Sequence, residues 1–203
     1  CSQDEFTRLQ HDRPFREEVF SSVIRTRMRE WVALADEKLK ASSVRAFFNA
    51  GNDDTFDIDP IIDLSATLRR PEGQCLEIDD FTMISTGFTN LTPFRCPRDI
   101  PEDDLAARIA TMAAQVRDMS RCIFNFHCPP LNSQLDSAPM LGPDLQPRMG
   151  AFGVEYAPAG SMAVRRAIER HQPLLGLHGH IHESRGATMI GNTLCINPGS
   201  EYQ

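Results

Sequence analysis

The chain has 203 residues, of which 41% are hydrophobic and 24% are charged, so it is long enough for one α/β domain with a sizeable core. Its formal net charge is −7, which argues against a nucleic-acid partner and against an anionic membrane surface. No apolar run approaches the ~20 residues of a membrane span, and the first residues do not resemble a signal peptide. We therefore expect a cytoplasmic protein with no membrane partner.

The first third of the chain predicts one long helix followed by shorter elements. Residues 13–41 place apolar side chains at helical spacing among charges, which predicts an amphipathic helix. A short β-type run, residues 44–48, stops at Gly51, and we expect a short helix after Pro60.

The middle of the chain alternates between strand and helix patterns. Residues 75–88 predict one or two strands, and residues 89–99 predict a loop. Residues 101–119 open with a proline and three acidic residues, which suit the positive end of a helix dipole, so we predict a helix here. Residues 121–127 then predict a buried strand that ends at His127.

The last third begins with residues 128–160, a segment rich in proline and glycine that predicts a long functional or mobile loop. A helix is expected over residues 161–172, with Ser161 as its N-cap. Residues 173–180 predict a strand, and residues 187–200 predict a hairpin that turns at Gly191-Asn192. This alternation predicts a single α/β domain over the whole chain, residues 1–203.

The six cysteines are scattered along the chain and form no Cys-x-x-Cys pair. A chain of this length does not need disulfide bonds to fold, and Cys122 and Cys195 lie in apolar, strand-like runs. We therefore expect free thiols in a reducing compartment.

Three predicted strands are each followed by a residue type that can bind metal. Asn52 follows the first, His127 follows the second, and His180 and His182 follow the third. Sites in open α/β sheets gather where strands end, and imidazole and amide groups are good ligands for Zn²⁺, Mn²⁺ or Fe²⁺. Gly179 would let the backbone pass close to a metal or a phosphate.

The motifs "AGNDD", "FNFHCPP", "GLHGHIHES" and "NPGSEY", in this order, resemble the calcineurin-like metallophosphoesterase family. The likeness runs from Val44 to the end of the chain and is nearest to a small prokaryotic branch in which GHIHES is followed by NPGS. It implies two packed mixed β-sheets flanked by helices. It also implies a hydrolase that cleaves small phosphate mono- or diesters by attack of a metal-bound hydroxide.

The resemblance also implies roles for individual residues. Asn52, His127 and His180 would bind one divalent metal ion (Mn, Fe or Zn), and His182 would bind a second. Asn52, Asp53 and His180 occupy the catalytic positions of the family motif. Two neighbours, His178 and Glu183, would contact and orient the ligands without binding the metal themselves. A purely structural role is the alternative for His178. A homo-oligomer is compatible with these expectations.

Two departures from the family pattern limit the mechanism. Asp53 stands where the family has a histidine that protonates the leaving group, so the chain favours diesters with good leaving groups; an ionised Asp53 would repel phosphate. No Asp-x-His and no Gly-Asp precede Gly51, so the ligands are all uncharged and hold at most one cation weakly. We expect the chain to be the C-terminal portion of a longer protein, without the N-terminal strands and ligands of the complete dinuclear site.

Two other functions compete with this one. A catalytically inactive metallophosphoesterase-like binding or scaffold module would explain the missing carboxylates directly. A structural zinc site could form from His127, His178, His180 and His182, although structural zinc normally recruits several cysteines.

Overall fold

The computed structural model describes residues 2–200. Its internal contacts divide the chain into two compact units. The helical unit comprises Cys1–Phe48 and Thr55–Arg70, and the sheet unit comprises Asn49–Asp54 and Pro71–Gln203. The expectation of a single domain over residues 1–203 stays a prediction.

The helical unit begins with two consecutive helices. Helix α1, Gln3–His11, is held at its start by a capping box and is not predicted by the sequence pattern. Helix α2, Arg13–Leu39, confirms the helix predicted over residues 13–41 but not its amphipathic character, because only Met28 and Val32 are buried while Trp31 is 53% exposed. Asp12 separates the two helices because its extended backbone ends α1 while its carboxylate caps the first turn of α2.

The strand predicted over residues 44–48 is largely wrong. Only β1, Ala46–Phe47, forms, and it pairs in parallel with β2, Leu68–Arg69, outside the large sheet. Val44 is 64% exposed, so the apolar run is not a buried strand. The pairing with β2 covers only Ala46 and Phe47 of the predicted strand.

A short helical segment connects the two strands of this unit. The 3₁₀ turn Phe56–Ile58 leads into helix α3, Asp59–Ile62. The predicted helix is therefore present but includes Pro60 in its first turn, where the missing proline N–H has no partner to lose.

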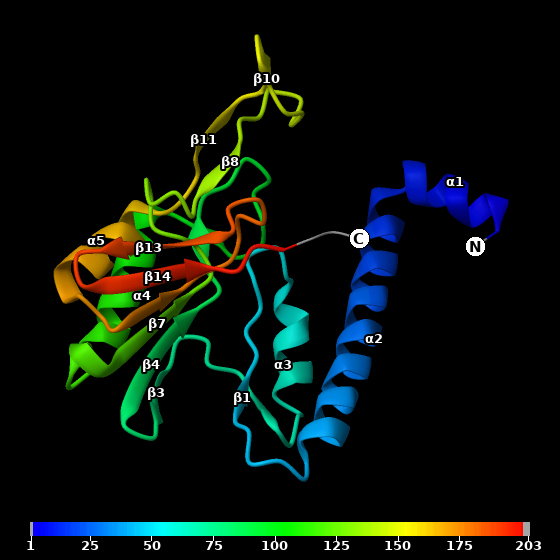
Figure 1. Cartoon of the computed structure of the whole chain (residues 1–203). Helices are drawn as coiled ribbons and strands as arrows, with labels where there is room; N and C mark the ends of the chain where they lie inside the picture. Colours follow the sequence, from blue (N-terminus) through cyan, green and yellow to red (C-terminus); the bar gives the residue numbers. More distant parts are fainter. Residues whose placement is uncertain (1, 201–203) are drawn as a thin grey trace. The chain divides into compact units, whose positions relative to one another are not determined.

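The sheet unit is built on one six-stranded mixed sheet (Figure 1). Its strands are β3 Cys75–Ile78, β4 Phe81–Thr86, β7 Cys122–Phe126, β12 Leu175–Leu177, β13 Gly186–Ile190 and β14 Thr193–Asn197. They lie in the order β13-β14-β12-β7-β4-β3, with four parallel central strands and an antiparallel strand at each edge. These strands confirm the strand predictions from residue 75 onward, and Gly191 turns the last hairpin with a φ of 61°.

Two helices cover one face of this sheet. Helix α4, Glu102–Ala113, ends before the predicted residue 119, and α5, Met162–His171, begins at the predicted N-cap Ser161. The fully buried core between these helices and the sheet comprises Ile84, Leu105, Ile109, Phe124, Phe126, Val164, Ile168 and Cys195. The predicted burial of Cys122 and Cys195 as free thiols is confirmed.

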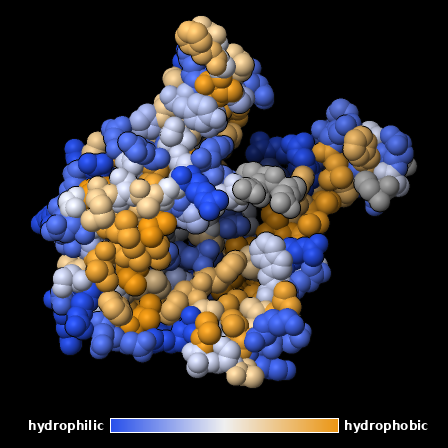
Figure 2. All heavy atoms as spheres, in the orientation of Figure 1, coloured by the Kyte–Doolittle hydropathy of each residue, from blue (hydrophilic) through white to orange (hydrophobic). Residues whose placement is uncertain are grey.

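The opposite face of the sheet carries a cross-strand row of apolar residues. Paired residues of five neighbouring strands make up this row: Met83, Ile123, Leu175, Leu194 and Met189. Met189 and Leu194 are exposed, and Figure 2 shows a hydrophobic surface over β13 and β14.

The segment predicted as a loop over residues 128–160 contains a narrow arm of four short strands. Strand β8, Ser137–Pro139, pairs with β11, Tyr156–Pro158, and β9, Met149–Gly150, pairs with β10, Gly153–Val154 (Figure 1). These strands are too short and too rich in proline and glycine to show an alternating pattern.

The remaining short elements are one two-stranded sheet and one 3₁₀ turn. Strand β5, Thr89–Asn90, pairs in parallel with β6, Asp99–Ile100, so the ends of the loop predicted over residues 89–99 are paired. A 3₁₀ turn, Met119–Arg121, precedes β7.

The fold is mixed α/β, as predicted. Residues 2–200 form one six-stranded sheet and four two-stranded sheets, and a second large sheet is not among them. Within this part of the chain, no helix is long and apolar enough to cross a membrane.

Candidate functional site

The candidate site lies at the carboxyl ends of the four parallel strands. His127, directly after β7, donates its N–H to the Thr86 carbonyl at 2.9 Å. Gly179, beyond β12, donates to the His127 carbonyl at 2.9 Å. The hydrogen-bonded register of β4, β7 and β12 therefore continues for one or two residues beyond the strands. Side chains placed there lie at the same edge of the sheet.

Asn52 reaches this edge on a loop, residues 49–54, here called the Asn52 loop. The sequence interpretation placed it at the end of a sheet strand, and the structure corrects this because β1 is outside the sheet. The loop instead passes over the end of β4, where a Cβ on Gly87 would lie 1.8 Å from the Ala50 carbonyl oxygen. A Cβ on Gly51 would lie 2.9 Å from Nε2 of His127. Glycine at both positions allows this approach.

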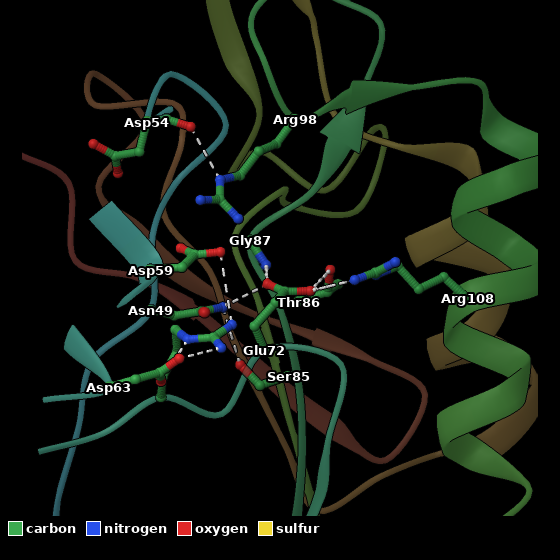
Figure 3. Close-up of polar contacts among 11 residues, drawn as sticks. Asn49, Asp54, Asp59, Asp63, Glu72, Ser85, Thr86, Gly87, Arg98 and Arg108 are labelled. Atoms are coloured by element: carbon green, nitrogen blue, oxygen red, sulfur yellow. Dashed lines mark hydrogen bonds and ion pairs between the residues drawn. The ribbon is translucent and has the colours of Figure 1, made fainter. Parts of the chain in front are cut away.

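One end of the Asn52 loop is fixed by a buried carboxylate, Glu72, whose side chain is 6% exposed. Glu72 accepts hydrogen bonds from Nδ2 of Asn49 at 3.1 Å, from the Gly87 N–H at 2.6 Å and from the Thr86 hydroxyl at 3.0 Å (Figure 3). The Arg108 guanidinium lies 2.9 Å from the same carboxylate and balances its charge. Burying a carboxylate is tolerated because it is so fully hydrogen-bonded.

The other end of the loop is fixed by Arg98, which is 1% exposed. Its backbone N–H donates to the Asn52 carbonyl at 3.1 Å. Its Nε donates to the Asp54 carbonyl at 3.0 Å, as Figure 3 shows. The Asp54 carboxylate in turn accepts the Gly51 N–H at 2.8 Å. These contacts set the backbone on both sides of Asn52.

The Asn52 side chain, which is 5% exposed as a residue, joins a carboxylate to an imidazole. Its Nδ2 donates to Asp99 at 2.9 Å, and its Oδ1 lies 3.0 Å from Nδ1 of His180. Because a carboxylate facing Nδ2 can only accept, the amide carbonyl must face His180. Nδ1 of His180 therefore carries the hydrogen of this contact.

Asp99 is a site residue that sequence reasoning missed. Besides Asn52, its carboxylate accepts hydrogen bonds from Thr89, Thr92 and the Cys96 N–H. Burial opposes ionisation of Asp99, but hydrogen bonds from Thr92 and Asn52 outweigh it and lower the pKa of this carboxyl group. Asp99 ends a proline-flanked segment with no periodic pattern, so the sequence gives no signal for it.

The rings of His127 and His180 lie side by side, with centroids 5.3 Å apart and planes inclined by 62°. Burial, followed by the charges of His180, His182 and His178, lowers the pKa of His127 to about 3. Burial also lowers the pKa of His180, opposed by the charge of Asp99 and assisted by that of His182. Both rings are therefore neutral near pH 7, which is the form that binds metals.

The structure does not bring every predicted site residue into this group. The charge of His182 lowers the pKa of both His127 and His180. Its backbone carbonyl accepts the Ser200 N–H at 3.1 Å. Asp53 is exposed and accepts a hydrogen bond from the Cys96 thiol at 3.5 Å. Glu183 is exposed, and no hydrogen bond or ion pair joins its side chain to another residue of the range 2–200.

His178 is engaged on the helix-covered side of the sheet. Its Nδ1 lies 3.0 Å from the Phe126 carbonyl oxygen and 3.1 Å from that of Cys128, so this nitrogen donates to the backbone. Burial lowers the pKa of its ring to about 4. These contacts favour the structural role for His178 and leave a four-histidine zinc site without one of its members.

Asn52 and His180 fit one cation between them if the ring hydrogen of His180 moves from Nδ1 to Nε2, because a metal then takes the place of the hydrogen in this contact. Two donor atoms that each lie ~2.1 Å from one metal are ~3.0–3.4 Å apart, which matches the 3.0 Å between Oδ1 and Nδ1. Within the described part of the chain, however, no three His, Cys, Asp or Glu side chains are arranged to hold a metal. The donor set therefore fits a cation in part and provides no directly facing carboxylate.

Comparison with known proteins shows the fold but names no activity. No family model matches the chain. Over 150 residues it is 27% identical to the uncharacterized protein MJ1162 of Methanocaldococcus jannaschii, a match that covers 73% of this chain and 61% of that protein. The chain thus spans about 61% of the length of this curated relative.

Two solved structures are similar to the chain. One crystal structure has a TM-score of 0.64 at 17% identity, over 97% of this chain and 74% of the other. The second, TT1561 of Thermus thermophilus, has a TM-score of 0.53 at 16% identity, over 84% of this chain and 70% of the other. The α/β fold of this chain is therefore shared with known structures.

Proposed function

We propose that this chain carries part of the active centre of a calcineurin-like, metal-dependent phosphoesterase that hydrolyses phosphate mono- or diesters. The observation that carries the proposal is the pair of donors, Oδ1 of Asn52 and Nδ1 of His180, 3.0 Å apart beside the ring of His127. The order of the motifs around these residues supports it independently. So does their position at the ends of parallel strands.

In this proposal, Asn52, His127 and His180 hold one divalent cation (Mn, Fe or Zn), and His182 belongs to a second. The bound cations would activate a water molecule and neutralise charge that develops on the phosphate. The complete centre requires carboxylate ligands, and among the described residues the carboxylate nearest in the network, Asp99, faces the amide nitrogen of Asn52 and not the donor pair. We therefore propose that these ligands come from another part of the whole protein.

The residues of this chain would act mainly by binding and orientation. Asp99 keeps the carbonyl of Asn52 turned toward His180. It also adds a negative charge, because its carboxylate is hydrogen-bonded to this proposed ligand. The neutral rings of His127 and His180 leave nitrogen lone pairs available for metal. Asp53 stands where the family motif has the histidine that protonates the leaving group, so the proposal favours diesters whose leaving groups need no acid.

We also propose that the complete fold is a sandwich of two packed mixed sheets. The face opposite α4 and α5 supports this, because its apolar row runs across five strands and ends in exposed Met189 and Leu194. Two sheets that pack face to face interdigitate such inner-face residues.

The competing function, an inactive binding or scaffold module, has one observation in its favour. The described residues hold no set of three His, Cys, Asp or Glu side chains placed around a metal. An inactive descendant needs no such set, so metal binding and turnover have to be measured separately.

The test uses the whole natural protein. Mn²⁺ binding is measured by calorimetry, and hydrolysis is measured with bis(p-nitrophenyl) phosphate, a diester with a good leaving group. The wild type should bind Mn²⁺ and hydrolyse the diester, and His180→Ala should abolish both. His11→Ala makes the same change at an exposed position on α1 and should leave both unchanged.

Unchanged turnover in His180→Ala would remove the proposed assignment. A wild type that binds Mn²⁺ but cleaves no phosphoester would favour the binding module. A wild type without affinity for Mn²⁺, Zn²⁺ or Fe²⁺ would contradict the metal centre itself.

A further inference from the structure

The motif "NPGS" at the end of β14 contributes a buried side chain to the loop that carries the candidate histidines. Its first residue, Asn197, is 1% exposed. Nothing in the proposed ligand set uses this residue. Its contacts nevertheless point toward the turn at His180.

One amide nitrogen of Asn197 contacts three backbone carbonyls. Nδ2 lies 2.9 Å from the Ile181 oxygen, 3.3 Å from the Gly179 oxygen and 3.2 Å from the Leu135 oxygen. Gly179 and Ile181 flank His180 on its two sides. The same side chain therefore holds the peptide group before His180 and the peptide group after Ile181.

His180 needs such support because its backbone is in an unusual conformation. Its φ is 64°, in the left-handed region that residues with a Cβ rarely adopt. The Ile181 N–H donates to the Gly179 carbonyl at 2.7 Å and closes a tight turn around His180. Residues in this region persist only where the surroundings impose them.

The end of the motif supports the next histidine in the same way. The carbonyl of Asn197's side chain accepts the Gly199 N–H at 2.9 Å, which turns the chain after β14. The Ser200 N–H then donates to the His182 carbonyl at 3.1 Å. Asn197 and the turn that follows it thus contact the backbone beside His180 and at His182.

We infer that Asn197 is the positioning residue that fixes the turn over residues 179–181 and so aims the ring of His180 at Asn52. An amide suits this place because its NH₂ group donates to several carbonyls, whereas its carbonyl accepts from Gly199. An aspartate of the same shape would set a negative oxygen against three carbonyl oxygens. The consequence for metal binding rests on the proposed function, whereas the turn itself does not.

The test compares Asn197→Asp with Asn192→Asp. Asn192 lies in the exposed turn of the same hairpin, so the control makes the same charge change five residues away. The first readout is NMR of the metal-free protein, in which φ-sensitive couplings and backbone carbon shifts report the left-handed conformation of His180. The second readout is Mn²⁺ affinity by calorimetry.

Asn197→Asp should lose the left-handed signature of His180 and bind Mn²⁺ about 10–100-fold more weakly, while Asn192→Asp keeps both. If the aspartate variant does not fold, Asn197→Ala removes the amide without adding charge and is measured instead. A variant that folds and retains the signature overturns the inference, whatever its affinity for metal. A wild type that binds no Mn²⁺ counts against the proposed function alone, and the NMR comparison still decides the role of Asn197.

Discussion

Among single residues, Asp99 matters most to the candidate site because it joins Asn52 to a network of hydrogen bonds. Its carboxylate fixes which end of the Asn52 amide faces His180. It is also hydrogen-bonded to Asn52, one of the proposed ligands, which are all neutral groups. A negative charge in that position favours a cation without bonding to it.

Replacing Asp99 with Asn should therefore weaken Mn²⁺ binding by about 10–100-fold. The isosteric change removes the charge and allows the Asn52 amide to turn over. Calorimetry measures the affinity, and Asp80→Asn, at an exposed position in the β3–β4 turn, is the matched control. Equal affinity in Asp99→Asn and the wild type would show that this carboxylate does not serve the site.

Among the secondary-structure elements, helices α4 and α5 are joined by the carboxylate of one residue, Glu102. Glu102, in the first turn of α4, accepts hydrogen bonds from the Ser161 hydroxyl at 2.8 Å, from the Met162 N–H at 3.0 Å and from the Ala163 N–H at 2.8 Å. These N–H groups open α5 and have no partner inside their own helix. Glu102 thus completes the cap that Ser161 begins.

Glu102→Gln should lower the free energy of unfolding by about 1.5–3 kcal/mol, the usual value for hydrogen bonds to a charged group. Chemical denaturation measures the change. Asp103→Asn, at the exposed neighbouring acid in the same turn, should cost clearly less. Equal losses in the two variants would mean that the contact with α5 adds nothing to a general helix-dipole effect.

The elements that the sequence predicts well are those that bury one regular face. Helices α4 and α5 and the strands of the six-stranded sheet follow their periodic patterns. Helix α2 forms where it was predicted, but its apolar residues do not bury one face. The arm within residues 128–160 and strand β1 do not, because each pairs only two or three residues at a time. The sequence also predicts that His127 and His180 lie at one edge, since His127 directly follows β7 and His180 lies three residues beyond β12.

The parts of the site that the sequence cannot predict depend on contacts between distant segments. Asn52 arrives by a loop whose path is set by Glu72 and Arg98. The contact between Asp99 and Asn52 joins residues that are 47 positions apart, and neither lies in a periodic pattern. Only the folded backbone shows that these side chains meet.

At the scale of the whole molecule, a cation at the candidate site should stabilise the protein. Ligand that binds only the folded state adds about 2.7 kcal/mol at a free concentration 100 times its Kd. Mn²⁺ should therefore raise the melting temperature of the wild type, and EDTA should reverse the increase. His180→Ala should show no increase, and an equal increase in that variant would place the bound metal elsewhere.

The lack of a side chain at residue 87 limits which sequences can keep this site. A Cβ there would lie 1.8 Å from the Ala50 carbonyl oxygen, so even alanine forces the loop away from the sheet. Asn52 follows two residues later and would move with it. The residue at position 87 and the aim of the Asn52 amide therefore cannot vary independently, either in natural variants or in an engineered library.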